Sequence, residues 1–484
     1  MTHPSVAIIG AGPGGLTAAY ELVRRGLAPV VLERADRPGG IARTETYKDY
    51  LFDIGGHCFC TKVYRVRDIW RAILGEQFIT VPRLSRIYYR GKFYDYPLSI
   101  PNVVGNLGAV ESMRIFGSYC RAKLRPIRDE QTFEQWVTNR FGDRVYRTFF
   151  KTYTEKVWGI PCSEIRADWA AQRIKGLSLS KAVINALFKV NRSNNSTLIH
   201  QFEYPRLGPG QMWERCTDIV RAGGATVQFE TSVTQVHHAD GRVSHLEVRQ
   251  GGQTRRIEAE HFITSMPLSA LVRMMHPAPP QAVLDAAAGL NYRDFLIVTL
   301  IADREKLFPD NWIYIHAPEV RVGRIQNFKN WSKDMVPDLS KTSLGMEYFC
   351  NEDDDLWAMD DASLIALATK EIDQLGLAPA SCISDGCVIR QRKAYPVYDG
   401  TYRMHLETIR KWLAGFENLQ TIGRNGMHRY NNQDHSMLCG LQAAENVLGA
   451  DHDLWEVNTE RSYYEEHQVG DKARQNGSGM KRAS

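Results

Sequence analysis

The sequence predicts an α/β fold that begins with a Rossmann-like βαβ unit, and three observations carry this prediction. A short apolar run at residues 6–9 has the composition of a buried parallel strand. A cluster of glycines follows it, and residues 16–25 then place their apolar side chains at helical spacing. A second apolar run at residues 29–32 completes the strand–turn–helix–strand order of such a unit.

The glycine cluster predicts a dinucleotide site. Gly10, Gly12 and Gly15 let the backbone turn tightly and approach a pyrophosphate, whose charge rests on the N-terminus of the following helix. Glu33 follows the second strand 23 residues after Gly10. That separation is close to the spacing of about 20 at which a carboxylate accepts a hydrogen bond from a ribose hydroxyl. An accidental glycine turn would not explain the strand, helix, strand and acid in this order.

Residues beyond Glu33 favour FAD over NAD. Gly39, Gly40 and Arg43 resemble the extended fingerprint of FAD enzymes, in which a second glycine pair and an arginine close over the pyrophosphate. The alternative is an ordinary glycine turn with a surface arginine. We therefore expect FAD as the cofactor. Further cofactor contacts are expected at Gly56, Val233 and Gly423.

Composition is typical of a globular enzyme built from two or three interleaved units, with 484 residues, 43% hydrophobic and 24% charged. The net charge of +5 is small and both signs are mixed along the chain, which argues against a nucleic-acid partner. A positive pocket for an anionic small-molecule substrate is compatible with it. No motif encodes the oligomeric state, so a homo-oligomer is left open.

Nine cysteines, scattered without metal-ligand spacing, predict a reducing cytoplasmic setting and no bound metal. Cys58 and Cys60 form the one close pair, and two buried thiols or a redox pair are the two interpretations. The first strand begins almost at Met1, which leaves no room for a signal peptide. No apolar stretch approaches 18 residues, so we expect no membrane span.

The pattern along the chain predicts a cofactor domain built from separated segments, with substrate-binding regions inserted twice. Residues 68–190 carry mostly helical segments rich in aromatic and basic residues, whereas residues 270–400 alternate strands with loops. We predict a first FAD-binding segment (1–75), a helical substrate insertion (76–195), a second FAD-binding segment (196–270), a substrate-domain sheet (271–410), a third FAD-binding segment (411–467) and a disordered tail (468–484).

Several short blocks resemble the UDP-galactopyranose mutases, within the broader amine oxidase and protoporphyrinogen oxidase superfamily of FAD enzymes. Gly55-Gly56-His57 resembles the Gly-Pro-His segment that the mutases lay beside the flavin ring. The most specific block is 151–159, which resembles the mutase run Tyr-Thr-x-Lys-Gln-Trp-Gly. Residues 324–329 resemble Arg-Ile-Ile-Glu-His-Lys, and residues 394–397 contain the mutase Tyr-Pro-Val block. Residues 423–432 resemble the segment Gly-Arg…Tyr-x-Asp.

The resemblance implies an α/β fold with a Rossmann-like FAD-binding domain (GR2 type) built from discontinuous segments, an inserted helical region and a mixed-sheet substrate domain. It implies catalytic roles for His57, Arg424 and Tyr395. The implied substrate contacts are Tyr153, Trp158, Arg173, Arg324, Tyr430 and Asn432.

Within that set, the resemblance implies that Tyr153, Arg173 and Arg324 bind a substrate diphosphate. It also implies that Trp158 forms one wall of the sugar site. Lys175 is a rival for the place of Arg173, whose spacing from Trp158 is one residue longer than in the mutases. The plain alternatives are a packed histidine, an amphipathic helix that buries two aromatic residues, and surface arginines.

The last block departs from the mutases at Asn432, where they have Asp, so the identity and orientation of the sugar stay open. The run at 429–435 is too polar to be core, which favours a site there.

The activity that the resemblance implies is pyranose/furanose ring isomerisation of a nucleotide-linked sugar, as in polysaccharide biosynthesis. Reduced flavin N5 attacks the anomeric carbon while arginines and tyrosines hold the diphosphate, and an unidentified reductant keeps the flavin reduced. The alternative is an FAD-dependent oxidoreductase of the amine oxidase and protoporphyrinogen oxidase class, for which paired arginines have no purpose. A non-enzymatic flavin scaffold would leave the polar cluster at 424–435 without a partner.

Overall fold

A five-stranded parallel sheet forms the base of the fold in the computed structural model, which describes residues 5–96, 98–167, 197–198, 201–458 and 466–467. The sheet has the order β10-β2-β1-β14-β21, and every neighbouring pair is parallel. Its strands are β1 (Val6–Ile9), β2 (Val30–Leu32), β10 (Thr226–Gln228), β14 (His261–Thr264) and β21 (Leu419–Thr421). Because they come from three separated stretches of the chain, the predicted Rossmann-like domain with discontinuous segments is confirmed.

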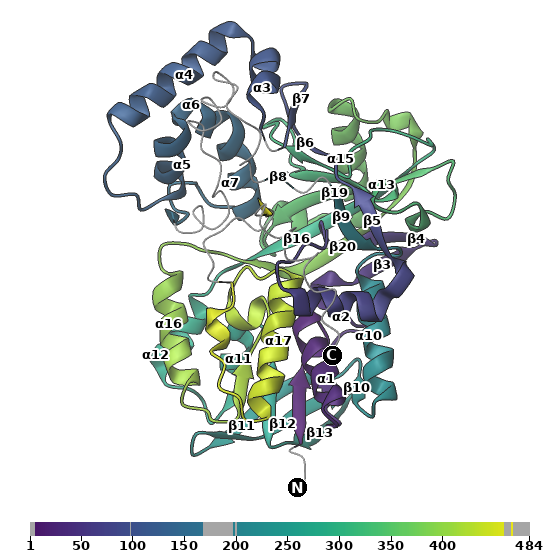
Figure 1. Cartoon of the computed structure of the whole chain (residues 1–484), viewed down its shortest axis with the longest axis vertical. Helices are drawn as coiled ribbons and strands as arrows, with labels where there is room; N and C mark the ends of the chain where they lie inside the picture. Colours follow the sequence, from purple (N-terminus) through teal and green to yellow (C-terminus); the bar gives the residue numbers. More distant parts are fainter. Residues whose placement is uncertain (1–4, 97, 168–196, 199–200, 459–465, 468–484) are drawn as a thin grey trace, which may run out of the picture.

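Three helices pack together on this sheet: α1 (Pro13–Arg24), α10 (Gly210–Ala222) and α17 (Gln433–Val447). Figure 1 shows α1 and α17 side by side, although more than 400 residues separate them in the sequence. Glycines permit this approach, since a Cβ added at Gly440 would lie 2.3 Å from the carbonyl oxygen of Gly14. Apolar side chains such as Leu16, Leu22 and Met437 fill the space between helices and sheet.

A four-stranded sheet with the order β13-β12-β11-β15 extends the cofactor half. Its strands are β11 (Ser232–Ala239), β12 (Arg242–Gln250), β13 (Gln253–Glu258) and β15 (Met275–His276). Asp240 and Gly241 both have positive φ, as the tight turn between β11 and β12 requires. One face of this sheet buries Val236 and Leu246 against helices α11 (Leu268–Met274), α12 (Gln281–Ala288) and α16 (Tyr402–Leu413).

The predicted mixed substrate sheet is present as seven strands in the order β20-β16-β19-β18-β17-β6-β7. The strands are β6 (Ser85–Tyr89), β7 (Lys92–Asp95), β16 (Tyr292–Ala302), β17 (Trp312–Ile315), β18 (Arg324–Asn327), β19 (Thr342–Cys350) and β20 (Ile383–Pro396). Its pairings are antiparallel except β17 with β6. Helix α15 (Asp361–Gln374) covers one side of it.

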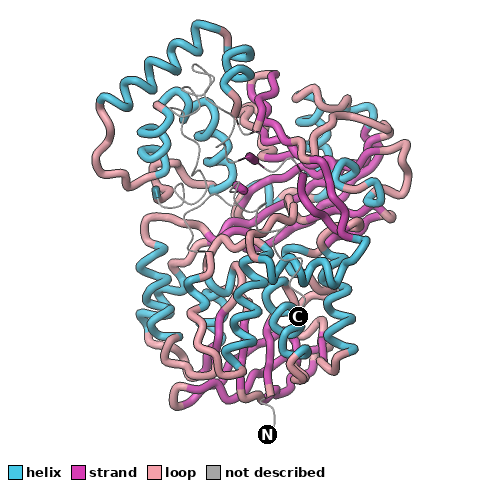
Figure 2. Tube along the Cα trace, viewed as in Figure 1, coloured by secondary structure: helices cyan, strands magenta, loops and turns pink. Residues whose placement is uncertain are grey.

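The stretch predicted as a helical insertion differs from expectation at its start. Two of its strands join the seven-stranded sheet, and a third, β5 (Phe78–Pro82), pairs with β9 (Gln201–Pro205). These short strands mix aromatic and charged residues, a length and composition at which helix and strand patterns cannot be separated. The helices follow: α3 (Ile100–Leu107), α4 (Ala109–Leu124), α5 (Phe133–Phe141), α6 (Asp143–Tyr146) and α7 (Thr152–Trp158). Figure 2 shows them grouped at one end of the molecule.

The remaining helices and strands connect these units. They are β3 (Thr44–Tyr47), β4 (Tyr50–Asp53), α2 (Tyr64–Leu74), β8 (Thr197–Leu198), α13 (Phe328–Trp331), α14 (Asp355–Ala358) and β22 (Glu466–His467). Among the residues that the structure describes, no helix is both long and apolar enough to cross a membrane. Arg173, Lys175 and the predicted tail lie outside the described residues, and the segment boundaries stay a prediction.

Candidate active site

A cavity of about 1100 Å³ runs from the glycine turn of the cofactor half to the seven-stranded sheet and helix α7. The N-termini of α1 and α17 both border it. Every predicted site residue that the structure describes lines this cavity, with the exceptions of Gly15 and Gly39. Segments as distant as residues 10 and 432 are therefore brought together.

The glycine turn at one end has the shape of a phosphate cradle. Gly10 has a φ of 101°, and a Cβ there would lie 2.2 Å from the Ser265 hydroxyl. Gly12 is the N-cap residue of α1 and has no side chain to accept a hydrogen bond from the first amides of the helix. These amides therefore remain available to a ligand in the cavity. This opening fits a pyrophosphate.

Gly15 and Gly39 support the turn from behind. A Cβ on Gly15 would lie 1.9 Å from the carbonyl oxygen of Gly10, so only glycine lets helix and turn pack this closely. Gly39 has a φ of 104° and donates its amide to the Ala11 carbonyl at 2.8 Å. Both hold the cradle in shape without bordering it.

Glu33 lies at the end of β2 with its carboxylate at the cavity wall. Its Oε2 accepts the Ala11 amide at 2.8 Å and its Oε1 accepts the Ala35 amide at 2.9 Å. Each oxygen of a carboxylate has a second lone pair, so Glu33 can still accept a ribose hydroxyl. Val233, at the start of β11, lines the same region.

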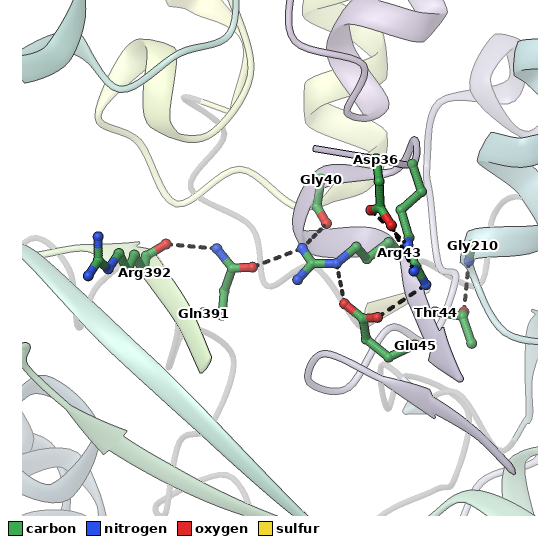
Figure 3. A network of polar contacts seen from close by, with 9 residues as sticks. Asp36, Gly40, Arg43, Thr44, Glu45, Gly210, Gln391 and Arg392 are labelled. Atoms are coloured by element: carbon green, nitrogen blue, oxygen red, sulfur yellow. Dashed lines mark hydrogen bonds and ion pairs between the residues drawn. The ribbon is translucent and has the colours of Figure 1, made fainter. Parts of the chain in front are cut away.

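Arg43 is engaged in a network that the sequence did not reveal (Figure 3). Its guanidinium donates to Glu45 Oε1 at 2.5 Å, to the Gly40 carbonyl at 2.9 Å and to Gln391 Oε1 at 3.0 Å. Gln391 belongs to β20 of the substrate sheet and in turn donates to the Arg392 carbonyl at 2.7 Å. Arg43 thus ties the cofactor segment to the substrate sheet. Nη1 donates to both Gly40 and Gln391, so the hydrogens of Nη2 are left for an anion.

At the other end, Tyr153 and Trp158 follow a π-helical turn, η3 (Arg147–Lys151), that leads into α7. Such turns often occur beside functional sites. Tyr153 stacks on His316 with ring centroids 5.1 Å apart and an interplanar angle of 5°. Trp158 is buried, with its ring 6.2 Å from that of Tyr430. Both aromatics are packed as the amphipathic-helix alternative expects, yet both border the cavity.

Arg324 on β18 forms an ion pair with Glu347 on β19, the Nε and Oε2 atoms being 2.6 Å apart. The side chain of Arg324 is 15% exposed and that of Glu347 is fully buried. Burial is the largest single effect on Arg324 and opposes its charge. The Glu347 carboxylate, together with the neighbouring tyrosines, outweighs burial and holds the pKa of Arg324 well above its ordinary value. Gln326 also donates to Glu347. Glu347 carries no signal in the sequence, since it is one acid among 55 acidic residues.

The Nη atoms of Arg324 lie over the glycine pair that precedes His57. A Cβ on Gly56 would be 3.6 Å from Nη1, and one on Gly55 would be 3.7 Å from Nη2. Gly55 also has a φ of 96°, which side chains rarely adopt. Two glycines here keep the cavity face of the guanidinium open.

His57 faces the cavity as a neutral imidazole. Burial lowers the pKa of His57 to about 4, and Arg424 and Arg324 act in the same direction. Its Nε2 donates to the Ile54 carbonyl at 2.8 Å, which fixes the ring orientation.

Arg424 lies beside a stacked pair of tyrosine rings. Its guanidinium carbon is 4.8 Å from the centroid of Tyr430 and 5.6 Å from that of Tyr395, and the two rings stack on each other 5.6 Å apart. Its Nε donates to the Asn431 carbonyl at 2.8 Å, and its Nη1 to the Ala394 carbonyl at 3.2 Å. Burial raises the pKa of Tyr395 above its ordinary value, with Tyr430 adding to the effect, so its hydroxyl stays protonated.

The polar run at 429–435 is partly interior, which corrects the expectation that it is too polar to be core. Asn431 and Asp434 are buried because each has hydrogen-bond partners: Asn431 donates to the Gly423 carbonyl at 2.9 Å and Asp434 accepts from Thr61 at 2.9 Å. Asn432 is the N-cap residue of α17, and its backbone amide donates to His435 Nδ1 at 3.3 Å. Asn432 lines the cavity wall.

Three further features of the cavity were not predicted. Tyr314 on β17 and His316 line it beside Tyr153, and burial lowers the pKa of His316 to about 3. The Nδ1 atom of His316 is buried without a hydrogen-bond partner among the described residues. Cys58 and Cys60 also line the cavity, in a loop with a single β-bridge and not on a strand.

Comparison with known proteins agrees with this geometry. A family model described as flavin containing amine oxidoreductase matches residues 13–403. The chain is 24% identical over 182 residues to a probable UDP-galactopyranose mutase of Klebsiella pneumoniae, covering 35% of this chain and 44% of that protein. It is 25% identical over 171 residues to a dTDP-fucopyranose mutase of Escherichia coli, covering 34% and 44%. The matches thus span less than half the length of either relative.

Solved structures extend the likeness of fold over nearly the whole chain. Reduced UDP-galactopyranose mutase matches with a TM-score of 0.81 at 21% identity, over 96% of this chain and 97% of that one. A putative protoporphyrinogen oxidase from Exiguobacterium sp. 255-15 gives 0.70 at 17% identity, over 92% and 99%. Putrescine oxidase bound to putrescine gives 0.61 at 17% identity, over 93% and 100%.

The likenesses to solved structures show a UDP-galactopyranose mutase-like fold, and the family match implies FAD as the cofactor. The open glycine cradle, the uncapped N-terminus of α1 and the carboxylate of Glu33 fit that group. Since the family model covers most of the sequence, the chain belongs to the flavin containing amine oxidoreductase family of enzymes.

Proposed function

We propose that the protein is an FAD-dependent nucleotide-sugar mutase that interconverts the pyranose and furanose forms of a sugar linked to a nucleoside diphosphate. The observation that carries this proposal is the cavity face of Arg324, held charged by Glu347 and left open by Gly55 and Gly56. A desolvated guanidinium fork aimed at a cavity suits the paired oxygens of a diphosphate.

FAD would be held by the cradle at the other end. The residues proposed to contact or shape its site are Gly10, Gly12, Gly15, Glu33, Gly39, Gly40, Arg43, Gly56, Val233 and Gly423. When bound in its reduced form, FAD supplies a nucleophilic nitrogen for the anomeric carbon of the sugar. An unidentified reductant and a cytoplasmic setting belong to the same proposal.

The chain's own task is to keep the diphosphate in place after its bond to the sugar breaks. Arg324 and Arg424 neutralise its charge from two separate segments, and Tyr153 donates a hydroxyl that stays protonated because burial raises its pKa. Tyr430 adds a second hydroxyl, and Arg173 is proposed as a further contact from outside the described residues.

The aromatic wall serves the sugar. Trp158 and Tyr395 exclude water from the space where the sugar lies, which prevents its loss by hydrolysis. His57 is neutral and therefore adds no charge beside the flavin. Asn432 would contact a sugar hydroxyl by its amide, which can both donate and accept.

An oxidoreductase that acts on an amine or porphyrinogen is the second candidate, and the family match together with the putrescine oxidase likeness favours it. Two guanidinium groups at the aromatic end argue against an amine, because an ammonium substrate would be repelled there.

The two candidates separate in one screen. We expect the FAD-loaded, dithionite-reduced protein to convert a nucleotide-hexose to its ring isomer under anaerobic conditions, detected by chromatography. Peroxide formation with an amine or a porphyrinogen, and no conversion of any nucleotide-sugar, would instead establish the oxidoreductase.

A further inference from the structure

A row of histidines crosses the four-stranded sheet on its solvent-facing side. His245 on β12 is directly opposite His237 on β11, and His237 is opposite His276 on β15. The neighbouring residues Val236 and Leu246 point into the core, so the histidines share the other face. Strands β11, β12 and β13 lie at the end of the molecule opposite helices α3 and α4 (Figure 1).

The side chains in this row converge. The rings of His237 and His245 stack with centroids 4.2 Å apart and an interplanar angle of 8°. Glu247, two residues after His245 on the same face, places Oε1 3.3 Å from Nε2 of His237. One ligand atom from each of these three residues lies within 4.8 Å of the other two.

We propose that His237, His245 and Glu247 form a binding site for one divalent transition-metal ion, with Zn²⁺ as the natural occupant. Two imidazoles and one carboxylate are a ligand set that suits such an ion, and water can complete the tetrahedron. With metal–ligand bonds of about 2.0–2.1 Å, the ligand atoms of a tetrahedral site stand about 3.4 Å apart. Side-chain movements of about 1.4 Å, with a turn of the two stacked imidazole rings toward the ion, therefore close the site.

Two details favour a bound metal ion over a simple ion pair between His237 and Glu247. The Nε2 atom of His237 is buried without a hydrogen-bond partner among the described residues, although Oε1 of Glu247 lies 3.3 Å from it. Nδ1 of His245 is 3.0 Å from the Ser244 hydroxyl, which orients the ring and leaves Nε2 for a metal. Such a partner on the second ring nitrogen is usual for histidines that bind metals.

The charged groups around the site are compatible with a cation. Arg256 on β13 is opposite Glu247 in the register, but its Nε pairs with Glu258 at 2.9 Å. His276 is exposed on β15, with its ring centroid 5.0 Å from that of His237.

The ion would fasten β11 to β12. Val233, at the start of β11, lines the cofactor cavity, and His237 lies four residues further along, roughly 13 Å at the usual rise of a strand. The site is therefore separate from the cavity and acts on it only through this strand. The prediction of no bound metal rested on the spacing of the cysteines. No cysteine takes part in this site, so that spacing could not reveal it.

Cobalt titration of the untagged, FAD-loaded protein tests the proposal. We expect one Co²⁺ per chain with visible d–d absorption and without the thiolate charge-transfer band of cysteine ligation. His237→Ala and Glu247→Gln should each weaken binding about tenfold or more. The control is His452→Ala, because His452 pairs with Glu445 at 3.0 Å, a carboxylate that Arg65 also contacts, and does not belong to the three-residue group.

Folding of the variants is checked by flavin content and melting temperature, and His245→Gln serves if His237→Ala does not fold. Absence of saturable binding by the natural chain would overturn the proposal. Equal affinity in the His237, His245 and Glu247 variants, or a thiolate band in the cobalt spectrum, would overturn it as well.

Discussion

Removal of the Arg324 guanidinium should abolish most of the affinity for a nucleoside diphosphate without removing the flavin. Arg324→Ala alone is a poor test, since it leaves the fully buried Glu347 without its partner. An unpaired buried charge of this kind costs about 3–5 kcal/mol of stability. The double variant Arg324→Met, Glu347→Gln removes both charges and keeps the side-chain volume, so the fold is preserved.

The expected loss follows from the position of the Nη atoms at the cavity wall. Two unit charges about 4 Å apart attract by about 4 kcal/mol at an effective dielectric constant of about 20. Loss of one partner in a desolvated pair costs about 2 kcal/mol or more. A loss of about 2–4 kcal/mol corresponds to a rise in Kd of about 30- to 700-fold.

The assay is calorimetric titration of the FAD-loaded double variant with UDP and with dTDP. The matched control is Arg321→Met, because Arg321 lies on the same chain segment but forms an exposed pair with Asp355 at 2.5 Å. We expect unchanged affinity in the control and a large loss in the double variant. If the double variant holds FAD and binds the diphosphates as tightly as the natural chain, Arg324 is not a residue of the site.

Three further predictions concern cofactor binding and pH. Gly15→Ala should abolish FAD binding, because the added Cβ would lie 1.9 Å from the Gly10 carbonyl oxygen; flavin absorbance measures this, and a yellow Gly15→Ala protein would contradict it. As its control, Gly117→Ala in α4 meets nothing within 4 Å and should be neutral or stabilising by up to about 1 kcal/mol. Burial raises the pKa of Asp53 to about 7 from 3.8, so the folded state binds more protons in that interval and stability falls as the pH rises. Asp53→Asn should therefore be more favourable at pH 8 than at pH 5 in thermal denaturation, and equal effects at the two values would refute the assignment. Burial lowers the pKa of His428 to about 4 from 6.5, so unfolding is favoured as the pH falls from 6.5 to 4; His428→Asn should flatten that dependence, and an unchanged slope would argue against it.

The cofactor half could be predicted from the sequence because backbone geometry determines it. Glycine is needed where φ is positive or a Cβ would clash, as at Gly10 and Gly15, and such needs are visible in a sequence. The strand and helix periods around these glycines are local. The strands β1 and β2 therefore begin and end within one residue of their predicted bounds, and α1 begins three residues before its predicted start and ends one residue before its predicted end.

Contacts between distant segments could not be predicted. The bond between Arg43 and Gln391 joins residues 348 positions apart, and Glu347 reaches Arg324 only because β18 and β19 pair. The short strands β6 and β7 were hidden for a related reason, since their stability comes from the sheet they join and not from their own pattern. The role of Arg173 stays a prediction.

The central claim is that the flavin works without net redox change, and an electron count tests it most directly. The FAD-loaded protein is reduced once with dithionite under anaerobic conditions and then supplied with an excess of UDP-galactopyranose or dTDP-fucopyranose. We predict many molecules of ring isomer for each pair of electrons delivered, with the flavin still reduced at the end and no activity in the oxidised protein. Formation of product only in proportion to the electrons exchanged, or equal turnover with oxidised flavin, would contradict the account.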